Sequence, residues 1–426
     1  MEDYFKDKKI TVMGLGLLGR GVGDAEFLAK NGADLIVIDL KIKKQLKTSL
    51  DRLKRFKNIK YTLGKHKLQD FRRRDMILKS AGVPLDSPYI KEAKKNKIPI
   101  EMSASLFTKL SGAKIIGVTG TRGKTTVTYM IYQILKKAKK RVFLGGNIKG
   151  VSTLALLGKV KKGDTVVMEL DSWQLQGFGD SKISPHIAVF TNLLPDHMNY
   201  YKGSMAKYFK DKANIYKYQK KGDYLIAGKE IAKKIKRKSI VPKSLPKNWR
   251  LKIAGEHNRK NAALARDATS VAGVSQRIIK KTMENFKGVE GRLELIKTIR
   301  GIKIYNDTTA TTPDATVAAL RAVGNNQNTV LIVGGADKGL DMKALLKEIP
   351  KFTKSVILLD GTGTKKLRNL KFEYKKANSL KSAVKLAMKE AKKGDTILFS
   401  PAFASFGMFK NEYDRGEQFN SLVNSL

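Results

Sequence analysis

The chain of 426 residues contains no cysteine. It can therefore form no disulfide framework, no thiolate metal site and no cysteine nucleophile. No uninterrupted apolar run approaches the ~18–20 residues that a membrane-spanning helix needs. The chain begins Met-Glu-Asp-Tyr-Phe-Lys-Asp, which is mostly charged and lacks the apolar core of a signal peptide. Together these absences predict a soluble, cytoplasmic protein.

Acidic residues are scarce: 38 Asp and Glu stand against 85 Lys and Arg, which gives a formal net charge of +47. A strongly basic chain often binds nucleic acid, usually through cations and aromatic residues gathered in one domain. Here the lysine clusters are spread along the chain, for example at 41–47, 136–141 and 233–238. We interpret most of them as solvated surface and keep a polyanion-binding role as the alternative. Either way, the charge attracts anionic substrates, with screening beyond about 8 Å.

A glycine-rich turn at residues 117–126 reads Gly-Val-Thr-Gly-Thr-Arg-Gly-Lys-Thr-Thr, between an apolar strand at 115–119 and a helical run at 127–135. Glycines let the backbone turn tightly, so that N–H groups and the helix N-terminus face an anion. Lys124 is placed to reach terminal phosphates, and the Thr125 hydroxyl to bind Mg²⁺. The turn predicts use of ATP or a close relative, although Val118 stands where the strict phosphate-loop pattern has glycine.

The narrower pattern Thr-Gly-Thr-x-Gly-Lys-Thr-Thr resembles the ATP loop of the Mur ligase family, the ATP-dependent amide-bond ligases of cell-wall synthesis, and of the related folylpolyglutamate synthetases. The resemblance continues, in family order, over nearly the whole chain. It implies that ATP is bound by the loop residues Gly120, Thr121, Gly123, Lys124, Thr125 and Thr126.

The first segment has a strand from Lys9 into Gly14-x-Gly16-x-x-Gly19, a helix through Lys30, and a second strand ending at Asp39. This pattern predicts a Rossmann-like unit with an acidic residue where a ribose or base could bind, but many dehydrogenases share it. In the resembling family the unit binds the UDP part of the substrate. The resemblance implies a UDP-substrate site formed by Gly16, Leu17, Asp39, Gly82 and Asn147, with Lys149 in place of a family glycine and Ala81 in place of a family proline.

Three further motifs imply metal ligands. A strand at 165–169 ends at Glu169, and a strand at 187–190 leads to His197; both carboxyl ends should meet at the ligand-binding edge of a parallel sheet. Lys212 has the spacing of the family lysine that is carbamylated, and a carbamate is a hard oxygen ligand for Mg²⁺. The resemblance implies two Mg²⁺ ions held by Thr125, Glu169, His197 and carbamylated Lys212. The alternatives are a solvated acid at Glu169 and an exposed charge at Lys212.

Later motifs extend the ATP site. Gly255-Glu-His-Asn258-Arg-Lys-Asn261 resembles a family motif whose amides contact adenine, with a simple helix N-cap as the alternative for Asn258. The motif around Arg292 resembles a hinge whose arginine clamps phosphate, as its planar guanidinium allows. Asp307 resembles the aspartate that binds the ATP ribose. Thr309 stands where the family has lysine, which removes one cation from the site.

Two stretches discriminate among members of the family. Gly-Gly-Ala-Asp-Lys338-Gly and the segment from 400 to 416 resemble the members that add D-glutamate, and the Asp-Asn-Pro-Arg motif of other members is absent. The resemblance implies that D-glutamate is bound by Lys338, Ser405 and Phe409. Phe403 replaces a family cysteine and Gly407 a family aspartate, both close to this expected pocket.

The sequence predicts an α/β fold of three domains: a Rossmann-like UDP-substrate domain at 1–109, a central phosphate-loop ATPase-type parallel-sheet domain at 110–290, and a Rossmann-like amino-acid domain at 291–426. The resemblance implies a cytoplasmic, monomeric ligase that joins D-glutamate to UDP-N-acetylmuramoyl-L-alanine with ATP through an acyl phosphate. A family member using another amino acid is the first alternative. A nucleic-acid-binding ATPase is the second, and it gives the later motifs no role.

Overall fold

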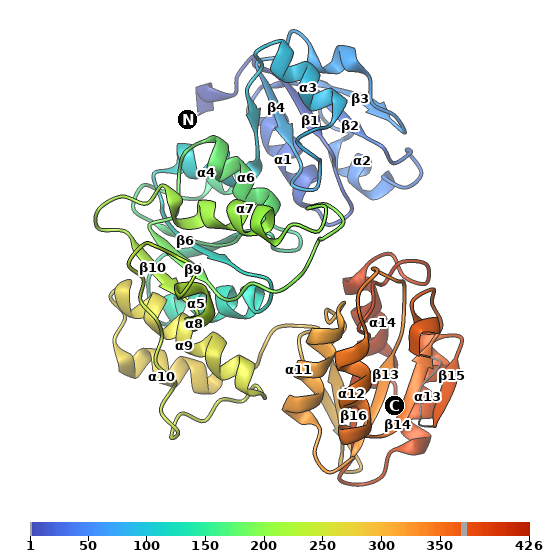
Figure 1. Ribbon diagram of the computed structural model, residues 1–426. Helices are drawn as coiled ribbons and strands as arrows, with labels where there is room; N and C mark the ends of the chain where they lie inside the picture. The colour runs from blue at the N-terminus through green and yellow to red at the C-terminus, as the bar shows by residue number, and fades with distance from the viewer. Residues whose placement is uncertain (1, 368–372) are drawn as a thin grey trace. The chain divides into compact units, whose positions relative to one another are not determined.

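The structure is a computed structural model that describes residues 2–367 and 373–426 (Figure 1). The chain divides into two compact units. The first contains residues 1–243 and 264–279, and the second contains residues 244–263 and 280–426. The strands of the described residues form two sheets in the first unit and one in the second. None of the described helices is long and apolar enough to cross a membrane.

The first sheet has the strand order β3-β2-β1-β4-β5, and its paired strands are parallel. Neighbouring residues of one strand face opposite sides of a sheet, so Val12 and Met13 enter separate buried clusters. The strand order reverses at β1, which lies between β2 and β4; in such sheets the crevice at this point binds ligands. The elements are η1 (Glu2–Tyr4), β1 (Lys9–Met13), α1 (Arg20–Lys30), β2 (Asp34–Asp39), α2 (Lys47–Leu53), β3 (Ile59–Leu63), η2 (Leu68–Phe71), β4 (Met76–Lys79), α3 (Pro88–Lys95) and β5 (Ile100–Glu101).

The second sheet, also parallel, has the order β10-β9-β6-β8-β7. The register pairs Val118 with Glu169 and Thr119 with Phe190, so the ends of β6, β8 and β9 meet at one edge. The elements are α4 (Ser103–Ser111), β6 (Lys114–Thr119), α5 (Lys124–Lys137), β7 (Val142–Gly146), η3 (Leu154–Gly158), β8 (Thr165–Glu169), α6 (Ser172–Asp180), β9 (Ile187–Phe190), α7 (Met205–Lys217), β10 (Tyr224–Ala227) and α8 (Lys229–Ala232). Helices α9 (Glu256–Val271) and α10 (Gln276–Asn285) follow.

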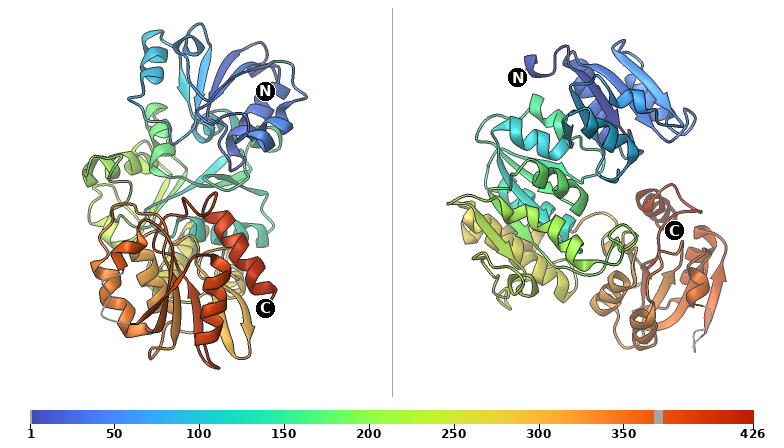
Figure 2. Two further views of the ribbon diagram at one scale, coloured as in Figure 1. Left: turned by 90° about the vertical axis from the view of Figure 1, so that its right-hand side faces the viewer. Right: turned by 45° about the horizontal axis from the view of Figure 1, so that its top comes forward.

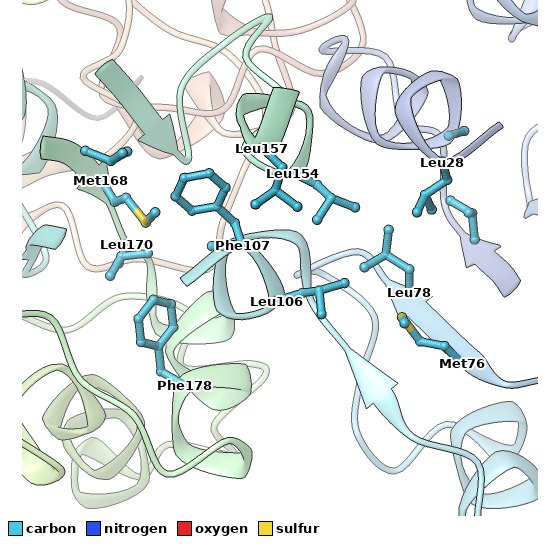
Figure 3. Close-up of a cluster of buried hydrophobic side chains, with 14 of the residues drawn as sticks. Leu28, Met76, Leu78, Leu106, Phe107, Leu154, Leu157, Met168, Leu170 and Phe178 are labelled. Atoms are coloured by element: carbon cyan, nitrogen blue, oxygen red, sulfur yellow. The ribbon is translucent and has the colours of Figure 1, made fainter. Parts of the chain in front are cut away.

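One cluster of buried apolar side chains joins these two sheets within the first unit. Figure 3 shows Leu28 and Leu78 from the first sheet layer at one end and Met168 from β8 at the other, with α4 and η3 between them. A polar contact accompanies the cluster: the Asp24 carboxylate accepts hydrogen bonds from the hydroxyls of Ser103, at 2.8 Å, and Ser152, at 2.6 Å. The first two sheets therefore share one core.

The sheet of the second unit has the order β11-β12-β16-β13-β14-β15; β11 is antiparallel to β12, and the other pairs are parallel. Val330 and Ile332 pack with α13 and α14, whereas Leu331 and Val333 pack with α11 and α12, so each face carries two helices (Figures 1 and 2). The elements are β11 (Glu294–Ile299), β12 (Ile302–Asn306), α11 (Pro313–Val323), β13 (Thr329–Val333), α12 (Lys343–Phe352), β14 (Thr353–Leu359), η4 (Thr364–Leu367), β15 (Tyr374–Ala377), α13 (Leu380–Glu390), β16 (Thr396–Phe399) and α14 (Glu412–Asn424).

The predicted α/β class is confirmed, with one mainly parallel sheet in each of the three predicted segments. The predicted segment boundaries at residues 109 and 290 stay predictions. The predicted helix at 127–135 lies inside α5, which begins three residues earlier, directly at Lys124.

Candidate active site

The predicted ATP loop connects β6 to α5 as expected. Gly120 has φ of +141° and Gly123, the residue before α5, has φ of +82°, both in the region that favours glycine. A Cβ on residue 120 would overlap the Thr191 hydroxyl. Thr126 is buried in the first turn of the helix. The loop therefore brings the N-terminus of a 14-residue helix to the carboxyl edge of the sheet, where an anion is stabilised.

The segment after β9 holds the ATP loop in place. Thr191 Oγ1 donates to the Arg122 carbonyl at 2.6 Å, and the Arg122 N–H donates to Asn192 Oδ1 at 2.9 Å. The Thr121 hydroxyl accepts the Leu194 N–H at 2.9 Å. The sequence analysis assigned no role to Thr191 or Asn192; the signal was their position directly after a buried strand. These contacts hold the loop against the segment that follows β9.

A chain of hydrogen bonds links the ATP loop to the first glycine loop. Thr125 Oγ1 donates to Glu169 Oε2 at 2.5 Å, and Asn147 Nδ2 donates to Glu169 Oε1 at 3.3 Å. The Arg20 guanidinium, at the start of α1, donates to Asn147 Oδ1. Glu169 is buried, which excludes the solvated-acid alternative. The hydroxyl of Thr125 and the carboxylate of Glu169 are adjacent hard oxygen donors, a donor set that fits Mg²⁺.

Lys212 on α7 is 1% exposed, which excludes the exposed-charge alternative. Its amine donates to the Gly120 carbonyl of the ATP loop at 2.8 Å. Burial, and then the nearby cation of Lys124, hold the pKa of Lys212 well below its ordinary 10.5. A lowered pKa increases the neutral fraction of the amine, and a neutral amine is the form that adds CO₂. Lys124 itself donates to the Thr121 carbonyl at 3.1 Å.

His197 is connected to Lys212 through Tyr208, whose ring centroid is 6.4 Å from that of His197 and 4.8 Å from the Lys212 amine. His197 also contacts Trp173, with ring centroids 4.6 Å apart, and its backbone has φ of +54°. The preceding Asp196 forms an ion pair with Arg122 at 3.0 Å. Within the described part of the chain, no group of three or more His, Asp and Glu side chains is arranged to hold a metal ion. The predicted Mg²⁺ set, which includes a threonine and a modified lysine, stays a prediction.

At the first sheet, the Asp39 carboxylate is used by its own loop: it accepts the N–H groups of Leu15 at 3.0 Å, Gly16 at 3.2 Å and Lys41 at 2.9 Å. It therefore shapes the glycine turn, while its predicted contact with uridine stays a prediction. Leu17 is exposed on the same loop, and a Cβ on Gly82 would meet no atom within 4 Å. Gly82 thus lies on an open surface.

The adenine motif lies in the second unit, at the start of α9. Asn258 Nδ2 donates to the Ala254 carbonyl at 2.7 Å, and Asn261 Nδ2 donates to Asn258 Oδ1 at 3.3 Å. The alternative of a simple N-cap for Asn258 is wrong, because α9 begins at Glu256 and the amide donates to the preceding turn instead of accepting a helix N–H.

Asp307 and Thr309 both form hydrogen bonds with the segment at residues 291–293. The buried Asp307 carboxylate accepts the Leu293 N–H at 3.0 Å and the Ser400 hydroxyl at 2.8 Å, and burial raises its pKa to about 7. Thr309 Oγ1 donates to the Gly291 carbonyl at 2.9 Å. Thr309 therefore connects its own loop to the segment around Gly291, whereas the lysine of the resembling family would place a positive charge at this position. Arg292 is half-buried, and its charge acts on Asp307.

The two stretches that resemble D-glutamate-adding members are adjacent in the second unit. Ala336 and Ala404 exchange backbone hydrogen bonds of 2.9 and 3.1 Å. Lys338 is exposed and donates to Thr311 Oγ1 at 3.1 Å. Ser405 is buried nearby, and Phe409 packs against the α13–α14 side of the sheet.

Phe403 belongs to the buried apolar cluster on the α11–α12 side of the sheet. Its ring is 1% exposed, and a Cβ on Gly363 would overlap it. Gly407 has φ of +95° in an exposed turn, a conformation that favours glycine over the family aspartate. The sequence analysis gave no role to Arg415 within the motif at 400–416; it is a buried arginine that donates to the Thr308 carbonyl at 2.7 Å and the Phe403 carbonyl at 3.3 Å. The signal was an arginine inside an otherwise core-facing stretch of α14.

The sequence was also compared with known proteins. Three family models match: Mur ligase MurD-like N-terminal domain over residues 8–101, Mur ligase middle domain over 118–244, and Mur ligase, glutamate ligase domain over 291–403. The UDP-N-acetylmuramoylalanine–D-glutamate ligase of Borreliella afzelii (strain PKo) is 37% identical, with 100% of this chain and 99% of the relative covered. The enzyme of the same name from Roseiflexus sp. (strain RS-1) is 35% identical, covering 98% and 99%.

Solved structures share the fold at lower identity. The UDP-N-acetylmuramate-alanine ligase MurC of Thermotoga maritima aligns with a TM-score of 0.64 at 21% identity, covering 98% of this chain and 99% of that one. The MurF ligase of the same organism, in complex with ADP, aligns with a TM-score of 0.61 at 17% identity, covering 100% and 97%. With relatives above 30% identity matched along its full length, the chain belongs to the Mur ligase family.

Proposed function

We propose that this protein joins D-glutamate to UDP-N-acetylmuramoyl-L-alanine with hydrolysis of ATP to ADP and phosphate. The observation that carries the proposal is the hydrogen bond from the buried Lys212 amine to the Gly120 carbonyl, in the same loop whose Thr125 donates to Glu169. The full-length relatives of the same name support the choice of substrates. Cytoplasmic location and a monomeric state stay predictions.

The reaction runs in two steps. An oxygen of the L-alanyl carboxylate attacks the γ-phosphorus of ATP, the bond to the β-phosphate oxygen breaks, and ADP leaves. The amine of D-glutamate then attacks the acyl phosphate carbon, forming a tetrahedral intermediate that expels phosphate and loses a proton to give the amide. Phosphorylation is needed because a carboxylate resists attack by an amine.

The residues have distinct tasks in this scheme. Lys124 and the N-terminus of α5 stabilise charge on the transferring phosphoryl group. Thr125, Glu169, His197 and carbamylated Lys212 would hold Mg²⁺, which supplies charge neutralisation at the phosphate oxygens. Lys338 and Ser405 would bind D-glutamate. Lys338 is exposed and donates to Thr311 Oγ1 at 3.1 Å.

The test is the initial rate of phosphate release with ATP and UDP-N-acetylmuramoyl-L-alanine, measured across D- and L-amino acids. We expect D-glutamate to be used far better than L-glutamate or D-aspartate. A preference for another amino acid would leave the proposed ligase mechanism intact but would show that D-glutamate is not the amino acid that is added. The absence of amino-acid-dependent phosphate release, with ATP hydrolysis stimulated by DNA, would overturn the proposal.

A second candidate is a ligase of the same mechanism with another amino acid. Gly407 favours it, because this position lacks the carboxylate that the resembling motif carries beside the amino-acid site. The same panel of amino acids separates the two candidates.

A further inference from the structure

Lys79 is a buried lysine that the proposed reaction does not use. It is the last residue of β4, and its side chain is 2% exposed. Its amine donates to the carbonyls of Val83 at 2.8 Å, Ser80 at 3.3 Å and Ala81 at 3.5 Å. A buried ammonium is costly unless it is hydrogen-bonded, so the turn at 80–83 is built around this group.

The turn lies where the topology of the first sheet predicts a ligand. Residues 14–19 follow β1 and residues 80–83 follow β4, so both leave the carboxyl ends of strands that flank the reversal of strand order. The Ser80 hydroxyl donates to the Gly14 carbonyl at 2.9 Å and ties the two turns together. The surface over Gly82 is open.

The peptide geometry of the turn follows from the lysine. No peptide bond of the described chain is cis, so each carbonyl points away from the N–H of the same peptide unit. Because Lys79 holds the carbonyls of Ser80 and Ala81, the N–H groups of Ala81 and Gly82 are directed away from the lysine. Among the described residues, these two N–H groups donate to no protein acceptor.

We propose that Lys79 is a positioning residue for the nucleotide substrate: it orients the N–H groups of Ala81 and Gly82 toward the diphosphate and places a positive charge beneath it. The inference rests on the proposed function for the presence of a UDP-linked substrate. Adjacent backbone N–H groups over a cation form an anion-binding concavity. Burial lowers the pKa of Lys79 to about 8, opposed by the carboxylates of Asp171 and Asp180, so the amine is mainly charged at pH 7.

The first test compares Lys79→Met with Lys91→Met, an exposed lysine on α3 of the same sheet layer. The probe is UDP alone, titrated by calorimetry. We expect about a tenfold or greater loss of UDP affinity in Lys79→Met, the effect of losing one charge-assisted contact, and less than about twofold in Lys91→Met. The KM for UDP-N-acetylmuramoyl-L-alanine should rise in parallel, while kcat and the KM for ATP change less than about threefold. A folded Lys79→Met that binds UDP like the parent protein would overturn the proposal.

The second test needs no variant, which matters if Lys79→Met fails to fold. Amide hydrogen exchange of the parent protein is measured with and without UDP. We expect UDP to slow exchange in the peptide that contains residues 80–83. Unchanged exchange there at saturating UDP would show that the turn is not the diphosphate site. UDP binding is independent of the ligase assay, so a protein that binds UDP through this turn but does not use D-glutamate would retain the Lys79 inference and lose the proposed function.

Discussion

Lys79 and Lys212 are both buried under a loop at the carboxyl edge of a parallel sheet, and each donates to a loop carbonyl at 2.8 Å. Burial is the main cause that lowers the pKa of both. They differ in the largest charge effect: at Lys79 it is the carboxylate of Asp171, which raises the pKa, whereas at Lys212 it is the cation of Lys124, which lowers the pKa further. Burial is the largest cause at both sites, and neighbouring charge adjusts how far each pKa falls.

The two glycine-rich loops that follow β1 and β6 share one backbone conformation. Gly19 and Gly123, each directly before a helix, share φ of +82° and ψ of −10°. The next residue is Arg20 in one loop and Lys124 in the other. Arg20 reaches across to Asn147, while Lys124 folds back on the Thr121 carbonyl of its own loop. The same turn thus connects two loops in one case and, in the proposed function, binds phosphate in the other.

The largest effect is expected for Lys212→Ala. If the neutral amine carries CO₂, the variant should lose at least about a hundredfold in kcat, because charge stabilisation of the phosphoryl group is lost. A short carboxylic acid should restore part of the activity, and Lys212→Arg should stay inactive. The same acid should not restore Lys79→Ala, whose missing group is a cation. Full activity of Lys212→Ala without any additive would remove the distinction between the two lysines.

Lys124→Ala should lose at least about tenfold in kcat, because a charge-assisted phosphate contact contributes roughly 1.5–3 kcal/mol where charge develops. Lys137→Ala, an exposed position at the other end of α5, is the matched control and should keep its rate. Lys124→Ala should also raise the pKa of Lys212, since the largest charge effect that lowers it is removed. Retention of more than a tenth of the parent rate, about 1.4 kcal/mol, would argue against the assigned role.

Arg20→Met should lower kcat/KM for the nucleotide substrate by about threefold to tenfold, less than Lys124→Ala because the guanidinium is only half-buried. Asn147→Ala should have at least this effect, since it also removes the contact with Glu169, and the double variant should be little worse than Asn147→Ala alone. Additive losses in this double-mutant cycle would mean that Arg20 and Asn147 act separately.

The smallest effect on activity is expected for Asp24→Asn, at the joint between the two loop-bearing sheets. Burial raises the pKa of Asp24 from 3.8 to about 6, so the folded state holds the proton more tightly than the unfolded chain. The contribution of this carboxyl to the free energy of unfolding is full below pH 3.8 and is lost as the pH rises through about 6. Because asparagine does not titrate, Asp24→Asn should abolish this pH-dependent decrease in the free energy of unfolding, which is on the order of 1–3 kcal/mol.

The measurement for Asp24 is the urea midpoint from pH 4 to pH 8, with Asp51→Asn, an exposed position on α2, as the control. Parallel pH profiles for Asp24→Asn and the parent protein would show that the Asp24 carboxyl does not titrate in this range.

The sequence predicted what depends on local spacing. Gly120, Lys124 and Thr125 lie at a strand-to-helix turn, and Glu169 ends a buried strand, because glycine spacing and apolar runs determine such elements directly. It could not predict contacts that depend on packing. Lys79 follows an apolar run, as a solvent-exposed residue at the end of a strand also would. Only the fold reveals that its amine lies under the next turn. The direction of the Phe403 ring depends on Gly363, which is distant in the sequence.

The difference between local spacing and packing also explains why the alternative for Asn258 was wrong and why the role of Thr309 was not predicted. An N-cap at Asn258 depends on where α9 begins, and boundaries are the least certain part of a sequence-based prediction. The role of Thr309 could not be read from the loss of a lysine, because its hydroxyl bonds to the backbone of Gly291 in a different segment.

The contact between Phe403 and Gly363 couples two segments that are distant in the sequence. A Cβ on residue 363 would overlap a ring carbon of Phe403, so a side chain there requires the ring to move. A smaller side chain at 403 would relax this restriction, so the effects of substitutions at the two positions should not be additive.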